Sequence, residues 1–221
     1  MPDMTESLKR GWFVTFEGPE GAGKTTQAKT LARRLESLGA AVLLTREPGG
    51  DAVAEKIRAL LKDPALNHAI GVRAEALLIQ AARAQHALNV VKPALAAGKV
   101  VICDRFADSS VAYQGYGRHL DAALVATLNA FSTAGLAPDI TFLMDLPPEE
   151  GLRRAESRAG GAPKDRFEDE GLEFHREVRR GFLDIARAEP GRVKLLDATA
   201  PKDLVAQQIY GHFHELLRRA S

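Results

Sequence analysis

The feature that most constrains this chain is segment 18–25, Gly-Pro-Glu-Gly-Ala-Gly-Lys-Thr, which matches Gly-x-x-x-x-Gly-Lys-Ser/Thr at every fixed position. An apolar run at 12–17 precedes it and predicts a strand, while residues 24–38 have the periodicity of an amphipathic helix. Glycines in this setting let backbone N–H groups turn toward phosphate oxygens, and the helix N-terminus adds partial positive charge. The segment therefore predicts a P-loop that binds a nucleoside triphosphate. The residues expected to contact ATP here are Gly18, Pro19, Glu20, Gly21, Ala22, Gly23, Lys24, Thr25 and Thr26.

The rest of the sequence alternates short apolar runs with longer amphipathic ones, which is typical of a parallel sheet covered by helices. Strands are predicted at 12–17, 41–45, 100–104, 140–145 and 193–197. Helices are predicted at 24–38, 51–61, 73–97, 121–134, 147–158, 167–188 and 201–219. Because no repeat, linker or low-complexity tract interrupts the 221 residues, one domain covering 1–221 is expected. The expected fold class is α/β, a P-loop NTPase fold with a five-stranded parallel sheet flanked by helices on both faces.

Charge and hydropathy limit the classes of partner. The formal net charge is +1, and a general nucleic-acid-binding protein usually has a clear basic excess, so no nucleic-acid partner is expected. No apolar run approaches the roughly 18 residues of a membrane span, and no secretory signal is visible, so a cytoplasmic location without a membrane partner is expected. The one cysteine, Cys103, lies in an apolar run and is expected to be buried and inert.

Several charged residues lie where phosphate chemistry needs them. Asp104 ends an apolar strand and could hold Mg²⁺ together with the Thr25 hydroxyl, although Asp145 ends another strand and is a rival. Arg105 follows at the strand end where open α/β sheets bind ligands, so it could grip a phosphate or form a salt bridge. Glu20 would repel phosphate, which leaves two interpretations: it faces a second ligand, or it is an exposed loop acid.

Two further arginine settings fit a phosphoryl-transfer enzyme. Arg83 lies in a mostly apolar helical stretch, where a guanidinium needs an anionic partner. The glycine-containing break at 159–164 lies within a segment of about 153–168 that is expected to form a lid over ATP. Its arginines are Arg153, Arg154, Arg158 and Arg166. For the first two of these, a solvated basic helix end is an equally good interpretation.

Longer segments carry a resemblance that covers almost the whole chain. They are FEGPEGAGKTT at 16–26, TREPGG at 45–50, RAEALL at 73–78, AAR at 81–83, DR at 104–105, DSSVAYQGYG at 108–117, PD at 138–139 and DRFE at 165–168. Together they resemble the thymidylate kinase family, and TREPGG and DSS-x-AYQG are much more specific than the P-loop. Because positions 19–22 hold no arginine, the chain resembles the bacterial type, whose catalytic arginine lies in the lid, and Arg158 is the candidate.

The resemblance implies transfer of the γ-phosphoryl group of ATP to dTMP with Mg²⁺, as a step of dTTP biosynthesis, by a homodimer. The implied catalytic residues are Lys24, Arg158, Glu20 and Arg105, and Arg158 and Arg166 would contact ATP. Thr25 and Asp104 would serve the metal. The residues implied for the acceptor nucleotide are Glu20, Arg58, Ile79, Arg83, Arg105, Ser109, Ser110, Tyr113 and Gln114, with Arg46 near its phosphate loop.

Two positions depart from the family pattern. Ile79 stands where an aromatic residue usually stacks on thymine, and Phe106 replaces the usual tyrosine after Asp104-Arg105. Both leave base selectivity open, so a UMP or dUMP kinase is an alternative. A GTP-binding switch is a weaker one, because no N-K-x-D segment for guanine is present. A non-catalytic nucleotide-binding protein is the third.

Overall fold

A five-stranded parallel sheet organises the computed structural model, which describes residues 10–66, 69–160 and 165–220. Its strands are β1 (Trp12–Glu17), β2 (Val42–Arg46), β3 (Val100–Asp104), β4 (Ile140–Asp145) and β5 (Val193–Asp197). Their order across the sheet is β2-β3-β1-β4-β5. Strands β2 and β3 lie on one side of β1, and β4 and β5 lie on the other, so the strand order switches sides next to β1. Open α/β sheets bind ligands at the carboxyl ends of the strands beside such a switch point.

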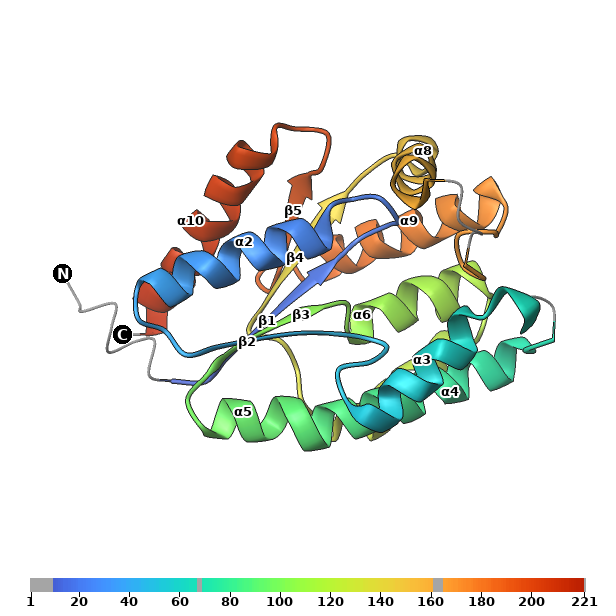
Figure 1. The fold of residues 1–221 in the computed structure, drawn as a ribbon, viewed down its shortest axis with the longest axis horizontal. Helices are drawn as coiled ribbons and strands as arrows, with labels where there is room; N and C mark the ends of the chain where they lie inside the picture. The colour runs from blue at the N-terminus through green and yellow to red at the C-terminus, as the bar shows by residue number, and fades with distance from the viewer. Residues whose placement is uncertain (1–9, 67–68, 161–164, 221) are drawn as a thin grey trace.

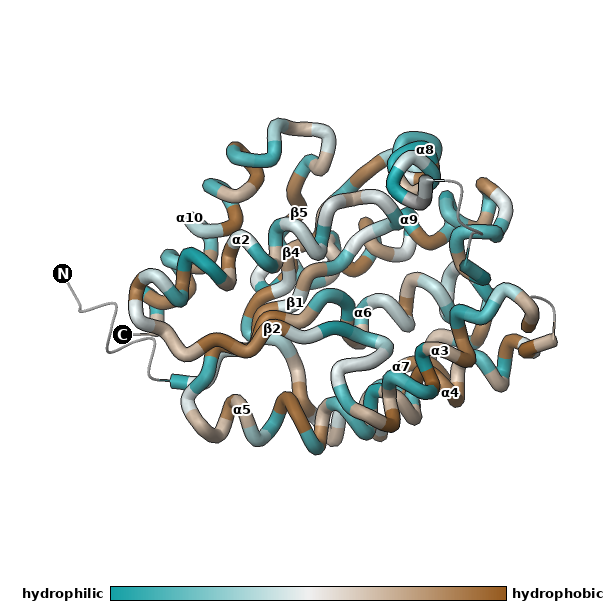
Figure 2. The backbone as a smooth tube through the Cα atoms, in the orientation of Figure 1, coloured by the Kyte–Doolittle hydropathy of each residue, from teal (hydrophilic) through white to brown (hydrophobic). Residues whose placement is uncertain are grey.

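One face of the sheet is covered by α2 (Lys24–Ser37) and α10 (Lys202–Ala220), as Figure 1 shows. Successive strand side chains point to opposite faces, so Val14 and Phe16 of β1 join the core formed with Leu35 of α2. Figure 2 shows hydrophobic segments along the central strands and hydrophilic ones on the outside of α2. This packing fixes the start of α2, and with it the P-loop, over the end of β1.

The opposite face is covered by α5 (Lys92–Ala96), by α6 (Ala107–Ser110) with the π-helical segment η3 (Val111–Gly117), and by α9 (Leu172–Ala188). Phe13 of β1 packs edge-on against Phe106 on this side, with ring centroids 4.9 Å apart. The remaining helices are α3 (Ala52–Lys62), η1 (Pro64–Leu66), α4 (Val72–His86), η2 (Ala87–Val91), α7 (Ala122–Thr133) and α8 (Pro148–Ala159). Of these, α4 packs against both α3 and α7.

The expected strands and most helices lie within two residues of their predicted bounds, but three stretches differ. The helix predicted at 73–97 contains a π-helical segment, η2, just before Pro93. Residues 107–117 form α6 and η3, although their serines and glycines gave no helical signal, because Ala112 and Tyr113 are buried against α9. The helix predicted from 167 begins at 172 because residues 166–169 form a turn.

Two smaller observations concern Cys103 and membrane association. Cys103 is fully buried on β3, as expected, and burial raises the pKa of its thiol well above the ordinary value. Within the described ranges, no helix combines the length and the apolar character that crossing a bilayer requires.

Candidate active site

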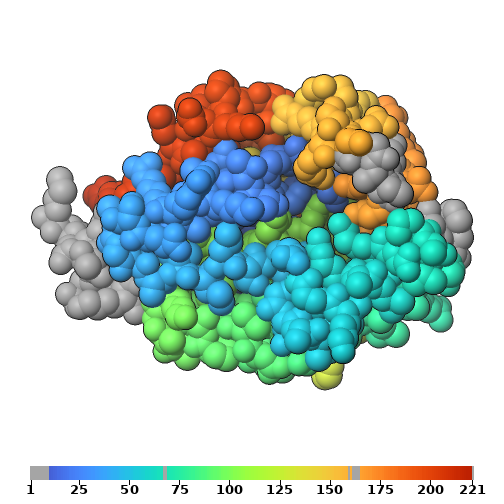
Figure 3. Space-filling model, viewed as in Figure 1, coloured from blue at the N-terminus to red at the C-terminus, as the bar shows by residue number. Residues whose placement is uncertain are grey.

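A cavity of about 630 Å³ opens at the carboxyl ends of β1, β2 and β3. The parallel register places Phe16 and Arg46 on either side of Asp104, so three strand ends contribute to one edge. Figure 3 shows the surface hollowed between the blue segment that includes α2 and the cyan segment that includes α3. The site is therefore assembled mainly from loops that follow strands.

The P-loop has the backbone shape that its glycines permit. Gly18, Gly21 and Gly23 have φ values of 137°, 70° and 85°, in a region that disfavours side chains. The Lys24 ammonium lies inside the loop and donates hydrogen bonds to the carbonyls of Gly18 (3.0 Å) and Pro19 (2.8 Å). Burial, and then the charge of Arg105, lower the pKa of Lys24 to about 8. The loop thus holds a buried cation that phosphate oxygens would stabilise.

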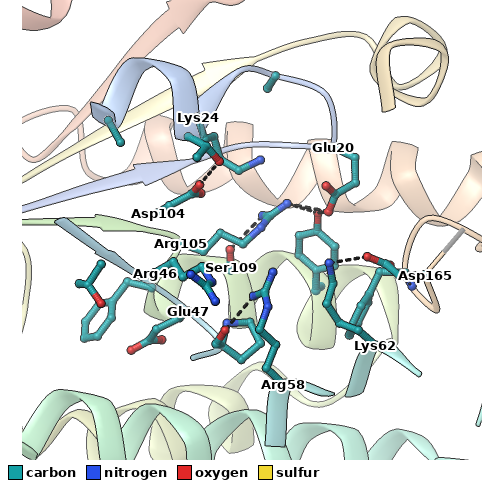
Figure 4. Close-up of a pocket in the computed structure, with 18 of the residues that line it drawn as sticks. Glu20, Lys24, Arg46, Glu47, Arg58, Lys62, Asp104, Arg105, Ser109 and Asp165 are labelled. Atoms are coloured by element: carbon teal, nitrogen blue, oxygen red, sulfur yellow. Dashed lines mark hydrogen bonds and ion pairs between the residues drawn. The ribbon is translucent and has the colours of Figure 1, made fainter. Parts of the chain in front are cut away.

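The Thr25 hydroxyl donates a hydrogen bond to the Asp104 carboxylate, which places two hard oxygen ligands side by side next to the P-loop (Figure 4). Mg²⁺ in phosphoryl-transfer sites is usually held by one or two protein oxygens, phosphates and water, so this pair fits that ion. Among the described residues, no cluster of three or more His, Cys, Asp or Glu side chains could hold a metal alone. The rival Asp145 accepts two hydrogen bonds from Arg179, at 2.7 and 2.9 Å, and does not line the cavity.

Arg105 connects the P-loop to the other half of the cavity. Its Nη1 donates to the Gly18 carbonyl (3.0 Å), and its Nη2 donates to Glu20 Oε1 (2.7 Å) and the Tyr113 hydroxyl (2.9 Å). Burial alone would raise the pKa of Glu20, but Arg105 and then Lys24 outweigh it and lower that pKa to about 2. Glu20 is therefore an ionised side chain in the cavity wall, as Figure 4 shows, and not an exposed loop acid.

Glu17, the last residue of β1, holds the turn in which Arg105 sits, and sequence reasoning missed it. Arg105 has φ 72°, an uncommon value for a residue with a side chain. The buried Glu17 carboxylate accepts hydrogen bonds from the Phe106 N–H (2.7 Å) and the Ser109 hydroxyl (2.6 Å). Burial, and then the charge of Asp108, raise the pKa of Glu17 to about 7. The sequence signal that could have identified Glu17 is an acidic residue at the end of an apolar strand.

Arg83 is almost fully buried, with 2% of its surface exposed, yet it borders the cavity. Its Nε donates to Glu47 (2.8 Å), its Nη1 to the Ser110 hydroxyl (2.8 Å) and its Nη2 to the Phe106 carbonyl (2.9 Å). Glu47, which lies in the TREPGG segment and was not singled out, also bonds His86 Nδ1 at 2.9 Å. The anionic partner expected for Arg83 is therefore in the chain itself, and it fixes the direction of the guanidinium.

Further basic side chains line the cavity between α3 and the P-loop. Arg58 donates to the Pro48 carbonyl (2.7 Å), and its pKa is lowered by burial and then by Arg46. Arg46 is half-exposed and pairs with Glu55 at 2.8 Å. Lys62, another residue that sequence reasoning missed, pairs with Asp165 at 2.6 Å. Figure 4 shows its ammonium on the same side of the cavity as Arg58. These cations form a second positive region for an anionic ligand.

The expected lid is described only in part, since 161–164 lie outside the described residues. Arg158 borders the cavity with a mostly exposed side chain, 3.4 Å from Glu168. Arg166 is instead buried, bonds Glu75 and the Leu61 carbonyl, and does not line the cavity. The expected site residues that do line it are Glu20, Gly21, Ala22, Gly23, Lys24, Thr25, Thr26, Arg46, Arg58, Ile79, Arg83, Asp104, Arg105, Ser109, Ser110, Tyr113, Gln114 and Arg158.

Known proteins share this arrangement over most of the chain. The family model for thymidylate kinase matches residues 16–209. The chain belongs to the thymidylate kinase family. A thymidylate kinase of Syntrophotalea carbinolica is 50% identical over 202 residues, covering 90% of this chain and 93% of the relative. One of Geotalea uraniireducens is 54% identical over 192 residues, covering 86% and 90%. The crystal structure of thymidylate kinase from Ehrlichia chaffeensis matches with a TM-score of 0.73 and 35% identity, covering 92% of this chain and 99% of that one.

Membership of the thymidylate kinase family confirms the expected resemblance, the P-loop NTPase fold and the assignment to nucleoside monophosphate kinases. The GTP-switch and UMP kinase alternatives are not favoured. Of the two departures from the family pattern, both border the cavity, and the Phe106 ring is also buried against Phe13. The side chain at 106 therefore contributes to the core on the second face of the sheet and brings no phenol hydroxyl to the site.

Proposed function

We propose that this protein phosphorylates dTMP to dTDP with ATP, as a step of dTTP biosynthesis. The observation that carries the proposal is one continuous cavity with two cationic ends. The P-loop with Lys24 forms one end, Arg58 and Arg83 border the other, and the Glu20–Arg105 pair lies between them. Such a cavity suits two phosphorylated ligands whose phosphates meet near Arg105.

The chemistry is direct in-line transfer, in which the protein positions the reactants and neutralises charge. Lys24 contacts the β- and γ-phosphates, and Arg158 approaches the transferred group from the lid. Arg105 holds the acceptor phosphate, and Glu20 faces the acceptor sugar. Because that phosphate is already ionised, no strong general base is required. The resemblance assigns Arg166 to the ATP site. Its side chain pairs with the buried Glu75, which supports a structural role instead.

Thr25 and Asp104 are the residues that would hold Mg²⁺, because their oxygens are adjacent beside the P-loop. When bound, this ion neutralises charge on the β- and γ-phosphates. The acceptor base would lie against Ile79, with Arg83 near a base carbonyl. Ser109, Ser110, Tyr113 and Gln114 would complete that part of the pocket.

An acceptor screen tests the function. ADP release is measured with dTMP, dUMP, UMP, GMP and AMP, each with ATP and Mg²⁺. We expect release with dTMP at the highest kcat/KM, and loss of about two to three orders of magnitude in the Lys24→Ala protein, because one preorganised charge is removed. A preference for UMP would overturn the assignment to dTMP. Normal turnover by Lys24→Ala would overturn the mechanism.

We also propose a homodimer, formed through α4 with η2 and α7. These neighbouring helices carry exposed apolar side chains that recur at helical spacing: Leu77 and Leu88 on the first, Leu124 and Phe131 on the second. Phe131 is 84% exposed, and an apolar surface of this kind usually marks a protein contact. A cytoplasmic location, expected from the sequence, stays a prediction.

A further inference from the structure

The guanidinium of Arg83 is held almost completely by protein acceptors. Arginine has five N–H donors in a rigid plane. The Nε hydrogen goes to Glu47, the Nη1 hydrogens are shared by Ser110, Asn129 and Gln80, and one Nη2 hydrogen goes to the Phe106 carbonyl. Among the hydrogen bonds of the described residues, the second Nη2 hydrogen has no acceptor. Since Arg83 borders the cavity, this hydrogen is the one left for a ligand.

Neither Gln80 nor Asn129 lines the cavity, and Asn129 comes from a helix, α7, that is wholly outside its wall. Asn129 Oδ1 accepts from Arg83 Nη1 at 2.8 Å and from Gln80 Nε2 at 2.8 Å, while its Nδ2 donates to the Ala107 carbonyl at 3.1 Å. These three partners fix which way the amide points, because only its oxygen can serve both donors.

Gln80 and Ser132 extend the same arrangement. The Gln80 oxygen accepts from Arg83 Nη1 (3.2 Å) and from the Ser132 hydroxyl (2.6 Å), and its amide nitrogen is the donor to Asn129. Gln80 is nearly buried on α4, one helical turn before Arg83. Two amides, from α4 and α7, therefore hold one edge of the guanidinium, opposite the Glu47 edge, and the Ser132 hydroxyl holds one of these amides in turn.

We infer that Asn129 is a positioning residue for the acceptor base: it fixes the plane of Arg83, so that the remaining Nη2 hydrogen points at a base carbonyl. The inference rests on the proposed role of Arg83 in binding that base. Without the Asn129 oxygen, Arg83 Nη1 keeps only Ser110 and the longer 3.2 Å bond to Gln80, and the Gln80 amide loses its own acceptor, so this edge of the guanidinium is held less firmly. The acceptor would then bind more weakly, while the P-loop end would be untouched, because Asn129 contacts no P-loop residue in the described part of the chain.

A pair of substitutions separates this role from packing. Asn129→Leu keeps a side chain branched at the same carbon and removes the oxygen, whereas Asn129→Asp keeps the oxygen. We expect the KM and the directly measured Kd for dTMP to rise about tenfold in Asn129→Leu, the cost of one hydrogen bond to a charged group. The KM for ATP and kcat should stay within about twofold of wild type. In Asn129→Asp, the KM for dTMP should return to within about threefold of wild type.

The matched control is Thr127→Ala on the same helix, which removes a hydroxyl bonded only to the Ala123 carbonyl (2.8 Å) among the described contacts. Its kinetics should match wild type. The inference is wrong if Asn129→Leu leaves the KM for dTMP unchanged or raises the KM values of both substrates equally. It is also wrong if the KM for dTMP is lower in Asn129→Leu than in Asn129→Asp. Asn129→Ala, judged in the same way, replaces a leucine variant that does not fold. A wild-type protein that prefers another monophosphate overturns the proposed function alone, and the Asn129 variants are then measured with that acceptor.

Discussion

Two buried ionisable side chains, Lys24 of the P-loop and Glu17 just before it, have pKa values displaced toward neutrality. Burial disfavours the charged form of each, and it is the largest cause in both cases. Lys24 meets phosphate in the proposed mechanism, whereas Glu17 holds the backbone of the Arg105 turn. One shift should therefore appear in nucleotide binding and the other in folding stability.

The lowered pKa of Lys24 should make ATP binding dependent on pH. In the free protein Lys24 loses its proton as the pH rises through about 8, and ATP phosphates favour the protonated form. ATP binding at pH 8 should therefore take up about half a proton, and the Kd should rise by up to tenfold per pH unit above this value. Calorimetry in buffers of different ionisation enthalpy measures the uptake. Lys24→Arg, which does not titrate, should remove it. Binding of ATP by the wild type without proton uptake would contradict this prediction.

The raised pKa of Glu17 should reduce stability as the pH rises. The folded pKa, about 7, lies above the ordinary value of 4.5, so the folded protein binds more protons between these values. The free energy of unfolding should then fall as the pH rises from about 4.5 to about 7, by at most about 3 kcal/mol. Glu17→Gln should lack this contribution. Urea unfolding of both proteins at pH 5 and pH 8 isolates it, since other groups cancel in the comparison. A difference that does not change with pH would count against it.

At the scale of elements, α4 joins the proposed acceptor pocket to the segment that follows residues 161–164. Its buried Glu75 accepts from Gln114 of η3 (2.9 Å), from Arg118 (3.1 Å) and from Arg166. Gln114 lines the cavity, whereas Arg166 leads into the turn before α9. This cluster holds three parts of the chain together through one carboxylate, so its loss should affect folding first.

Substituting two lid-region arginines should give opposite results. Arg166→Ala removes one of the two arginines paired with the buried Glu75 and leaves the Leu61 carbonyl without this donor, so the free energy of unfolding should fall by about 3 kcal/mol. Arg158→Ala removes an exposed side chain, so stability should change by less than about 0.5 kcal/mol. If Arg158 meets the transferred group, kcat should fall at least about a hundredfold in that variant. Chemical denaturation and kinetics on the two proteins check both expectations. A stable Arg166→Ala protein with a raised KM for ATP would return Arg166 to the ATP site.

At the scale of the whole molecule, exposed apolar side chains are concentrated on part of the described surface. The sheet and its core bury the large side chains of β1, β3 and β4, while α4 with η2 and α7 leave leucines and Phe131 in solvent. The same two helices carry Gln80 and Asn129 on their inner sides, next to Arg83. The proposed dimer contact would therefore lie directly behind the acceptor pocket.

Phe131→Glu should convert the proposed dimer to a monomer, because a carboxylate in an apolar contact is costly to desolvate. Light scattering after size-exclusion chromatography measures the mass. Leu204→Glu is the matched control, since Leu204 is an exposed apolar residue of α10 on the opposite face of the sheet. It should leave the mass unchanged. A wild-type monomer, or a Phe131→Glu dimer, would refute this interface.

The sequence by itself determined the features that depend on local pattern. The P-loop and the five strands follow from short-range periodicity and residue chemistry, and all are present in the structure. The sequence also predicted that Asp104 ends a strand. Because the parallel register aligns strand ends at one edge of the sheet, this places Asp104 near the P-loop. The sequence could not choose between Asp104 and Asp145, since both end apolar strands.

Only the tertiary structure decided which charges meet. Arg83 pairs with Glu47 across 36 residues and with Asn129 across 46, and Arg166 reaches Glu75 across 91. Such pairs depend on which helices pack together, and the cost of burying an unpaired charge then selects the partners. The helical state of 107–117 has the same origin, because burial against α9 overrides a weak local propensity. Chain-local physics determined the P-loop, and long-range packing determined the proposed acceptor pocket.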